Sequence, residues 1–280
     1  MSHPVANTFT SAAELVAEDD NRQGNCLLFK LGEKIIYVGD IHGHRRNLAK
    51  VIAHAALSVQ PHRRLVLQEL IHGGPTDQEG ADRSVEVLLR AARLKISYPG
   101  QVFFLMANHD ISQITGYEIL KNGRGECEAF DASLDRSFGQ DAEEVRSAIH
   151  RLLRNQPLAA RCENGLFMTH SLPSPNRMDL IDWDILNRPY VDEDFNRGGT
   201  LHEWVWGRDH PAEQLADLAE RLEAERFLLG HQPCKTGYQI QHGASIIIDS
   251  HHSHGVIMEF DAGLPLDENI DEHIRPIVAL

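Results

Sequence analysis

The stretch YVGDIHGHRRNL, residues 37–48, joins an apolar run to a segment with helical spacing. Asp40 and His42 follow the apolar run two residues apart, so on an extended chain both side chains project to the same side. A buried carboxylate beside an imidazole is costly unless something binds both, and the candidate is a metal ion. The stretch therefore predicts a strand, a metal-binding loop and then a helix.

The same alternation continues on both sides of this stretch. Apolar residues recur at helical spacing over residues 45–55 and 85–92. Strands are predicted over residues 26–29, 34–38, 64–70 and 102–106. The order strand, helix, strand, helix, strand predicts an α/β fold with parallel strands and helices packed on them. Ligands of such sheets gather in the loops beyond the carboxyl ends of the strands.

The folded domain is expected to span residues 26–262. Residues 1–25 are expected to be a mobile leader with one short helix, and residues 263–280 a C-terminal extension. Within the domain, residues 111–157 are mostly helical in pattern, and the polar region that holds the three tryptophans is expected to form long loops. Further strands are predicted over residues 158–162, 165–169, 226–229, 237–241, 245–248 and 256–260.

Composition and charge exclude several classes of protein. The 280-residue chain is 42% hydrophobic, which is enough for a sizeable core, and its formal net charge is −14. That charge argues against binding to nucleic-acid polymers or anionic membranes, but not against a small phosphorylated substrate, because a bound metal supplies local positive charge. The four cysteines form no CxxC pair, which argues against a zinc ribbon. The first twenty residues lack the features of an export signal, so we expect a cytoplasmic protein.

Polar side chains follow five of the apolar runs, each where the run ends. They are Asp40, His42, Glu69, Asn108, His109, Asp110, His170 and His231. Each alone has an ordinary explanation, since Asp40 can cap the next helix and Asn108 can serve a turn. Together, these carboxylates, amide and imidazoles can hold two divalent ions with a carboxylate bridging them. Mixed oxygen and nitrogen ligation suits Mn, Fe, Zn, Co or Ni better than Ca or a pure Mg site.

Five sequence blocks connect the chain to a known family. They are GDIHG at 39–43, ANHD at 107–110, NQPLAARCENGLFMTHSLP at 155–173, VWGRDH at 205–210, and GHQP at 230–233 followed by IIIDS. Through these blocks the chain resembles the calcineurin-like metallophosphoesterases over about residues 33–260. It is most similar to the branch that contains serine/threonine protein phosphatases and bacterial diadenosine-tetraphosphatase-like enzymes. The resemblance implies a two-sheet β-sandwich flanked by helices, in four layers α/β/β/α.

The resemblance also implies a role for each matching residue. The implied metal ligands are Asp40 and His42 for a first ion, Glu69 between the ions, and Asn108, His170 and His231 for a second. His109 would protonate the leaving oxygen, with Asp110 as a possible partner, while a hydroxide bridging the two ions attacks phosphorus. The two divalent ions are expected to be Mn and/or Fe, with Zn, Co or Ni as alternatives.

The segment QELIHGGP, residues 68–75, departs from the family's pattern GDxxDRGP. The bridging aspartate becomes Glu69, whose extra methylene moves the carboxylate unless the backbone retreats. The aspartate that orients the catalytic histidine becomes His72, and the phosphate-binding arginine becomes Gly73. These changes leave His109 less constrained and remove a bidentate phosphate contact.

Other residues can take over contacts with substrate. Arg208 is the leading candidate to replace the missing arginine, although an ion pair with a neighbouring carboxylate explains it equally well. Arg45 and His72 are further candidates for substrate binding. The histidines of DSHHSHG, residues 249–255, can contact substrate or simply be exposed loop residues.

The leading prediction is therefore a phosphoester hydrolase that depends on two divalent metal ions. Its phosphorylated substrate is a phosphoprotein or a nucleotide-type phosphoester, which the sequence does not separate. The alternative, supported by QELIHGGP, is a degenerate relative that keeps the fold and binds or regulates without turnover. Neither a nucleic-acid polymer nor a membrane is an expected partner, and the oligomeric state stays open.

Overall fold

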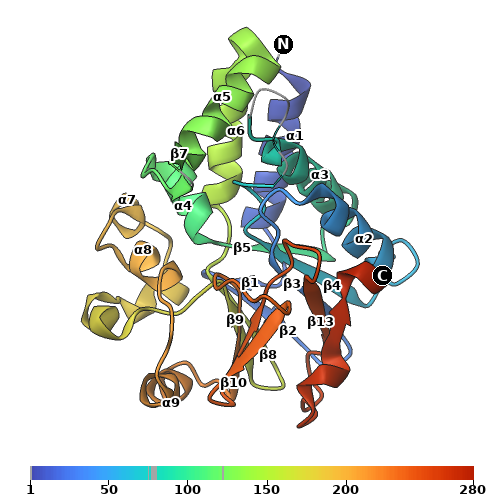
Figure 1. Ribbon diagram of the computed structural model, residues 1–280, viewed down its shortest axis with the longest axis vertical. Coiled ribbons are helices and arrows are strands. Elements are labelled where there is room, and N and C mark those ends of the chain that lie inside the picture. The colour runs from blue at the N-terminus through green and yellow to red at the C-terminus, as the bar shows by residue number, and fades with distance from the viewer. Residues whose placement is uncertain (1, 75, 77–80, 122) are drawn as a thin grey trace.

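The computed structural model describes residues 2–74, 76, 81–121 and 123–280 (Figure 1). Pro75, which ends the segment that departs from the family's pattern, lies outside these residues. The described strands form one sheet of five strands, one of seven strands and a separate two-stranded hairpin. The two large sheets carry the residues predicted to form the site.

The five-stranded sheet contains the strand of the opening stretch. Its order is β14 (Ile274–Pro276), β13 (Val256–Asp261), β3 (Lys34–Asp40), β4 (Arg63–Gln68) and β5 (Val102–Leu105). β3, β4 and β5 are parallel, and α2 (Arg45–Ala55) and α3 (Ser84–Ser97) connect them. The predicted parallel strands with helical crossovers are therefore confirmed, and the carboxyl ends of the three strands lie at one edge of the sheet.

The seven-stranded sheet brings a second set of strand ends to the site. Its order is β1 (Arg22–Gln23), β2 (Cys26–Phe29), β8 (Ala159–Cys162), β9 (Leu166–Thr169), β10 (Arg226–Leu229), β12 (Ser245–Ile248) and β11 (Tyr238–Gln241). β9, β10 and β12 are parallel, so the residues that follow β9 and β10 emerge at one edge. β2 and β3 follow each other in the sequence but belong to different sheets, so the turn at Gly32 carries the chain between the sheets.

The remaining helices cover the sheets or stand above them. They are α1 (Pro4–Ala17), α4 (Asn108–Thr115), α5 (Glu126–Phe138), α6 (Ala142–Arg154), α7 (Asp192–Phe195), α8 (Thr200–Val205) and α9 (Ala212–Arg221), with short 3₁₀ turns at Gly139–Asp141, Pro175–Leu180, Trp183–Leu186, Ile270–His273 and Ile277–Ala279. In Figure 1, α1, α3, α5 and α6 lie together at the top of the molecule. No helix among the described residues is both long and apolar enough to cross a membrane.

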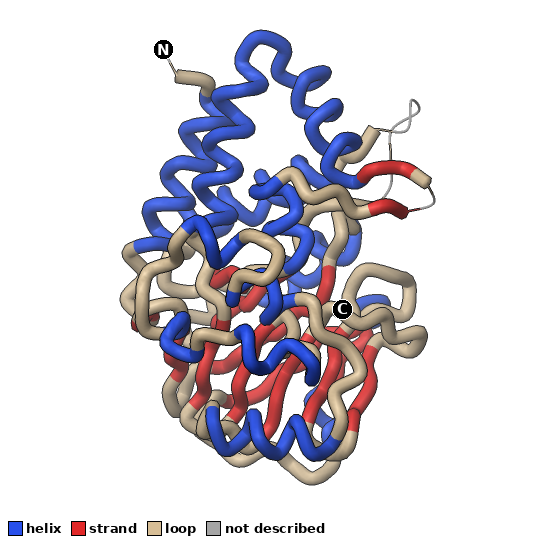
Figure 2. The backbone as a smooth tube through the Cα atoms, turned by 90° about the vertical axis from the view of Figure 1, so that its left-hand side faces the viewer, coloured by secondary structure: helices blue, strands red, loops and turns tan. Residues whose placement is uncertain are grey.

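Three clusters of buried side chains define the layers. One lies between the two sheets and contains Phe29, Tyr37 and Phe103. A second packs α1, α2, α3 and α6 against the outer face of the five-stranded sheet, and a third packs α8 and α9 against the outer face of the seven-stranded sheet. Figure 2 shows the strands of the two large sheets in the lower half of the molecule, a group of helices above them, and the small hairpin at the upper right. The predicted two-sheet fold flanked by helices is confirmed.

Both ends of the chain need correction. The segment over residues 1–25, expected to be a mobile leader, contains the 14-residue helix α1, and Phe9, Ala12 and Ala13 of this helix are fully buried against the core. The C-terminal segment is not a mere extension, because β14 pairs with β13 and Ile277 is buried in the same core. Small alanine side chains make the apolar stripe of α1 weak in the sequence, although they allow close packing on α6.

Two central regions also differ from expectation. The segment over residues 111–157 is mostly helical, as predicted, but a short hairpin of β6 (Leu120–Lys121) and β7 (Arg124–Gly125) separates α4 from α5. The tryptophan-containing region is not simply long loops, because α7, α8 and two 3₁₀ turns order it. Trp204 on α8 is fully buried and anchors this region to the seven-stranded sheet.

Candidate metal centre

The loops that follow the strands of both sheets meet at one place. The backbone amides of Ile41 and His42 both donate to the carbonyl of Glu69, at 3.1 and 2.8 Å, which joins the loops after β3 and β4. The backbone N–H of His231 donates to Oδ1 of Asp40 at 3.0 Å, which joins the loop after β10 to β3. Segments more than 190 residues apart in sequence therefore share one hydrogen-bonded platform.

Several of these loop residues adopt a backbone conformation that only glycine adopts without strain. His42, Glu69, His72 and His231 have φ angles of 42°, 47°, 62° and 66°. Such left-handed residues cost on the order of 1–3 kcal/mol each and persist only where the surrounding structure holds them.

Four side chains converge as a compact set of donor atoms. Oδ1 of Asn108 lies 2.7 Å from Nε2 of His170 and 3.0 Å from Nδ1 of His231, and these two nitrogens are 3.2 Å apart. Oε2 of Glu69 lies 2.9 Å from the same Nε2 of His170. Ligands about 2.1 Å from an octahedral metal ion lie about 3.0 Å from each other, so the spacing suits one shared ion.

Gln68 determines which nitrogen of His170 faces this set. The hydroxyl of Tyr37 lies 3.3 Å from the carbonyl of Leu228, to which it donates, and it accepts from Nε2 of Gln68 at 2.6 Å. Oε1 of Gln68 therefore accepts from Nδ1 of His170 at 3.0 Å. Nε2 of His170 is left without a proton, and its lone pair points toward Asn108 and Glu69 as a metal ligand requires.

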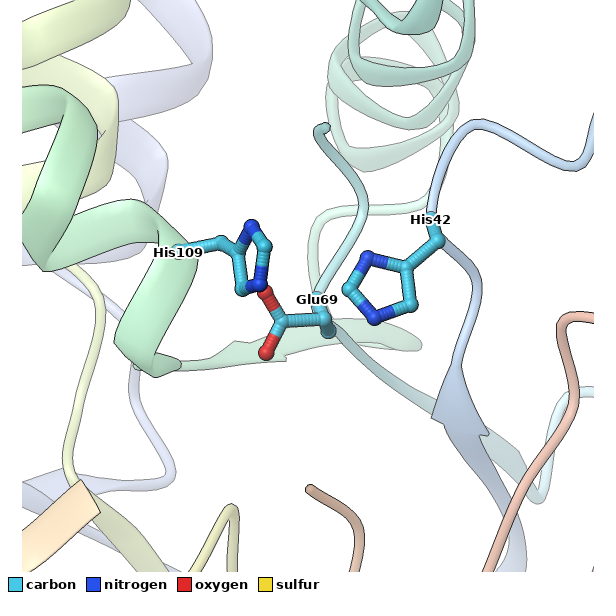
Figure 3. A group of neighbouring side chains, drawn as sticks. All are labelled: His42, Glu69 and His109. Carbon is cyan, nitrogen blue, oxygen red and sulfur yellow. The ribbon is translucent and has the colours of Figure 1, made fainter. Parts of the chain in front are cut away.

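His42 is prepared in the same way on the other side of Glu69. Nδ1 of His42 donates to the carbonyl of His72 at 3.0 Å, so Nε2 carries the lone pair and lies 3.9 Å from Oδ2 of Asp40. Figure 3 shows the carboxylate of Glu69 between the rings of His42 and His109. Donor atoms of Asp40, Glu69 and His170 lie within 4.8 Å of one another, as do those of His42, Glu69 and His109. Glu69 is common to both groups, as the predicted bridging carboxylate should be.

Among the described residues, the two carboxylates at the centre lie within ion-pair distance of histidines but of no lysine or arginine. Glu69 is 1% exposed, and neither of its carboxylate oxygens accepts a well-formed hydrogen bond from a described residue. Burial raises the pKa of Glu69 to about 8 and that of Asp40 to about 7. Burial also lowers the pKa of His42 to about 3 and that of His170 to about 4, so both rings are neutral at physiological pH. Neutral imidazoles around buried carboxylates are the donor chemistry of a divalent-metal site.

A chain of hydrogen bonds orients His109 at the start of α4. Nε2 of Gln113 donates to Oδ1 of Asp131 at 3.0 Å, so Oε1 of Gln113 accepts from Nε2 of His72 at 2.8 Å. Nδ1 of His72 consequently accepts from Nδ1 of His109, 3.0 Å away. This leaves Nε2 of His109 free to hold or receive a proton on the side of the donor atoms. His72 therefore contacts His109 in place of the family's aspartate, with a neutral ring instead of a carboxylate.

The other predicted residues lie in different surroundings. The carboxylate of Asp110 accepts from the backbone N–H of Ala107 at 3.0 Å and so holds the start of α4, and no hydrogen bond joins it to His109 among the described residues. Arg45 is half-exposed and pairs with Glu86 at 2.8 Å, on the surface formed by α2 and α3. Burial lowers the pKa of His231 well below its usual range, and Nε of Arg208 donates to Nε2 of this ring at 3.0 Å. Arg208 is thus beside the donor set.

Four residues near the site escaped sequence reasoning. Gln68 fixes the tautomer of His170, and Gln113 fixes that of His72. Lys121 approaches Gly73. Asp249 binds the ring of His251, which packs edge-on against His42. Gln113 follows His109 by four residues, so helical spacing alone signals that the two share a face. No comparable signal exists for Lys121, because it approaches the site from a hairpin that the sequence did not predict.

A family model described as calcineurin-like phosphoesterase matches residues 33–256. A protein serine/threonine phosphatase from Saccharomyces cerevisiae, described as similar to human phosphatase PP5, superposes with a TM-score of 0.70 at 15% identity, covering 98% of this chain and 92% of that one. A cold-active protein-tyrosine phosphatase of a psychrophile, Shewanella sp., has a TM-score of 0.58 at 14% identity, covering 89% and 82%. At these identities the likeness shows the fold alone. No curated protein sequence matches this chain.

Proposed function

Because the chain belongs to the calcineurin-like phosphoesterase family, we propose that it is a phosphatase that uses two divalent metal ions to hydrolyse a phosphoester. The observation that carries this proposal is the crowding of electron-pair donors. Asn108 Oδ1 and Glu69 Oε2 lie 2.7 and 2.9 Å from the unprotonated Nε2 of His170, and a cation bound among these lone pairs would offset their mutual repulsion.

In this proposal, as the resemblance implies, Asp40 and His42 would hold one ion and Asn108, His170 and His231 the other, with Glu69 shared. The short distances among Asn108, His170 and His231 support the second of these groups. Mixed oxygen and nitrogen ligands favour Mn and/or Fe, with Zn, Co or Ni as alternatives. When bound, the two ions would supply Lewis acidity, which would polarise a phosphoryl group and make water more nucleophilic at neutral pH.

His109 serves as the general acid in this proposal. Its Nδ1–H is held by His72, so its Nε2 is the atom that can carry a proton to the leaving oxygen. Of the predicted substrate contacts, Arg208 lies beside the donor set. His72 is fully buried with both ring nitrogens engaged, and Arg45 pairs with Glu86. The cytoplasmic location remains a prediction.

Two classes of phosphorylated substrate stay open. The two superposed structures are described as serine/threonine and tyrosine protein phosphatases, which favours a phosphoprotein for this chain. A nucleotide-type phosphoester requires the same metal centre, so it remains the second candidate. The acidic net charge of −14 disfavours long polyanionic substrates.

A degenerate binding or regulatory protein remains the rival, since Glu69, His72 and Gly73 depart from the family's pattern. The structure of the loop weakens this rival at two of the three positions. Glu69 reaches to 2.9 Å from His170 despite its extra methylene, and His72 retains a hydrogen bond to His109. Only at Gly73 is the family's phosphate-binding arginine still without a replacement in this loop.

The test combines metal analysis with hydrolysis of an aryl phosphate in added Mn. We expect about two equivalents of metal and Mn-dependent turnover. His109→Ala should retain the metal and lower kcat by about 10²–10⁴-fold. The matched control is His62→Ala, an exposed histidine at the opposite end of β4, which should change neither quantity. Less than one equivalent of metal together with no Mn-dependent turnover would contradict the proposal.

A further inference from the structure

The hairpin formed by β6 and β7 carries two cations, and one of them, Lys121, lies beside the loop that follows Glu69. Lys121 pairs directly with Arg124 across the hairpin, so both side chains leave from the same face of the ribbon. Both residues are exposed and line a hollow of about 480 Å³, whose other walls include Gly73, Gly74, Asp82 and Glu126. The hollow therefore adjoins the loop that follows Glu69.

The ammonium group of Lys121 occupies the space beside residue 73. A Cβ atom added to Gly73 would lie 3.4 Å from Nζ of Lys121 and 3.6 Å from Cβ of His42. A cation from a distant part of the chain thus lies where a side chain at position 73 would begin. Gly73 has a φ of 87°, a backbone conformation in which an arginine would be strained. Lys121 of the hairpin therefore supplies the positive charge at a place where residue 73 itself carries none.

The charge of Lys121 acts on the donor set itself. Burial is the main cause of the lowered pKa of His42 and His109, and Lys121 adds to it in both. Lys121 and Arg208 both favour the ionised form of Glu69. Arg208 contacts His231, whereas Lys121 approaches Gly73 and His42, so the two cations flank different halves of the donor set.

Lys121 and Arg124 repel each other across the hairpin, so an anion bound between them would stabilise it. Like charges directly opposite on paired strands destabilise a hairpin, and β6 and β7 have only two residues each. Asp82 and Glu126 line the same hollow. Among the described residues, however, no carboxylate lies within 4.0 Å of the ammonium group of Lys121, the distance of an ion pair. The ammonium therefore remains available to an anionic ligand.

We propose that Lys121 binds the non-reacting oxygens of the substrate phosphate, as the second cation of a clamp with Arg208, and that the hairpin hollow receives the part of the substrate next to that phosphate. The inference rests on the proposed function, because the phosphate is the one held at the metal centre. In the family's pattern an arginine at position 73 binds the phosphate; here Lys121, almost fifty residues further along the chain, would take that role.

The test measures binding of inorganic phosphate to Mn-loaded protein by calorimetry, and its competitive inhibition of aryl phosphate hydrolysis. Lys121→Met should weaken phosphate binding about tenfold, the usual effect of losing one charge-assisted hydrogen bond, while the metal content stays unchanged. Lys121→Arg should stay within about threefold of wild type, since it keeps the charge and a donor. Lys30→Met is the matched control, because Lys30 is exposed in the turn before β3, about 20 Å from Asp40.

The outcomes separate this inference from the proposed function. If Lys121→Met binds inorganic phosphate as tightly as wild type does, the assignment of Lys121 is overturned, whether or not the wild type turns over substrate. If the wild type shows no Mn-dependent turnover but Lys121→Met still binds phosphate more weakly, the clamp stands and the proposed catalysis fails. Equal weakening in Lys121→Met and Lys30→Met would also overturn it, since that result reflects only net charge.

Discussion

At the scale of single residues, the pair His72–His109 shows how a departure from the family's pattern is accommodated. The aspartate expected at position 72 would accept from His109 through a carboxylate. Here the neutral ring of His72 accepts instead, and it can do so only because Gln113 takes the proton on its other nitrogen. Gln113 is therefore a positioning residue for the general acid, although it touches neither metal ligand nor substrate in this arrangement.

Gln113→Leu should lower kcat about tenfold with little change in KM, because His72 is then free to rotate or change tautomer and His109 loses its fixed orientation. The measurement is steady-state hydrolysis of an aryl phosphate with saturating Mn. Gln113→Glu keeps an acceptor for His72 but sets a second carboxylate against Asp131, so it should recover only part of the activity, with the alkaline limb of the pH profile moved upward by the added negative charge. Unchanged kcat in Gln113→Leu would show that the chain of hydrogen bonds has no part in catalysis.

Arg208 and a bound metal ion require different tautomers of His231, so they compete for this ring. Nε of Arg208 is a donor only, so Nε2 of His231 must accept and Nδ1 must carry the proton. A metal ion at Nδ1 requires that proton to move to Nε2, which separates Arg208 from the ring and frees its guanidinium for phosphate. Metal loading and phosphate binding are thus linked through this arginine.

Arg208→Met should therefore bind Mn about three- to tenfold more tightly, while inorganic phosphate binds about tenfold more weakly. Metal affinity is measured by competition with a fluorescent chelator and phosphate affinity by calorimetry on loaded protein. Arg226→Met at the start of β10, the amino end of the strand that leads to His231, is a suitable control. A loss of Mn affinity in Arg208→Met would contradict the proposed competition.

At the scale of elements, much of the sheet structure could be predicted from sequence. Strands β2, β10 and β12 have the predicted bounds because short apolar runs between turns leave little choice of structure. Helix α1 was underestimated because its buried face consists largely of alanine, and the hairpin of β6 and β7 was missed because two-residue strands carry no periodicity. Tertiary packing, not local pattern, creates both elements.

Helix α1 provides the test of this correction. Phe9 is fully buried, so Phe9→Ala should lower the free energy of unfolding by about 3–5 kcal/mol. Asn7→Ala, an exposed position on the same helix, should change it by less than about 0.5 kcal/mol. The measurement is urea denaturation followed by circular dichroism. If both variants were equally stable, the helix would be a loosely attached leader after all.

At the scale of the whole molecule, the sequence indicated the candidate ligands but not how two sheets bring them together. Strand-end positions follow from apolar runs, and Asp40, Glu69, Asn108, His170 and His231 were identified in that way. The register between the sheets, and with it the contact of Asp40 with His231, depends on packing between β-strands that no local pattern encodes. Side chains that act through others, such as Gln68, depend on the same packing.

The site also links metal to the stability of the whole fold. In metal-free protein, burial raises the pKa of Asp40 from its ordinary value of 3.8 to about 7 and that of Glu69 from 4.5 to about 8. Between these limits the folded protein binds more protons than the unfolded chain, so stability falls as pH rises. Below about pH 7.5 the lowered pKa values of His42, His170 and His231 act in the opposite direction, since these histidines still bind protons in the unfolded chain.

Above about pH 7.5 the unfolded histidines have lost their protons and the buried carboxylates dominate, so metal-free protein should lose on the order of 1 kcal/mol of unfolding free energy between about pH 7.5 and 9. Mn-loaded protein should not show this decline, because the ions replace the protons. Urea denaturation with a chelator and with Mn, at several pH values, measures both. Glu69→Gln should remove most of the decline, and a metal-free protein whose stability rises over this interval would contradict the assignment.

The measurement that tests the dinuclear centre most directly is anomalous diffraction from crystals of the Mn-loaded protein. Two peaks are predicted, one within bonding distance of Asp40 and His42 and one within bonding distance of Asn108, His170 and His231, with Glu69 touching both ions. Anomalous peaks located elsewhere, or a well-ordered centre without any peak at saturating Mn, would contradict the proposed metal centre and the chemistry assigned to it.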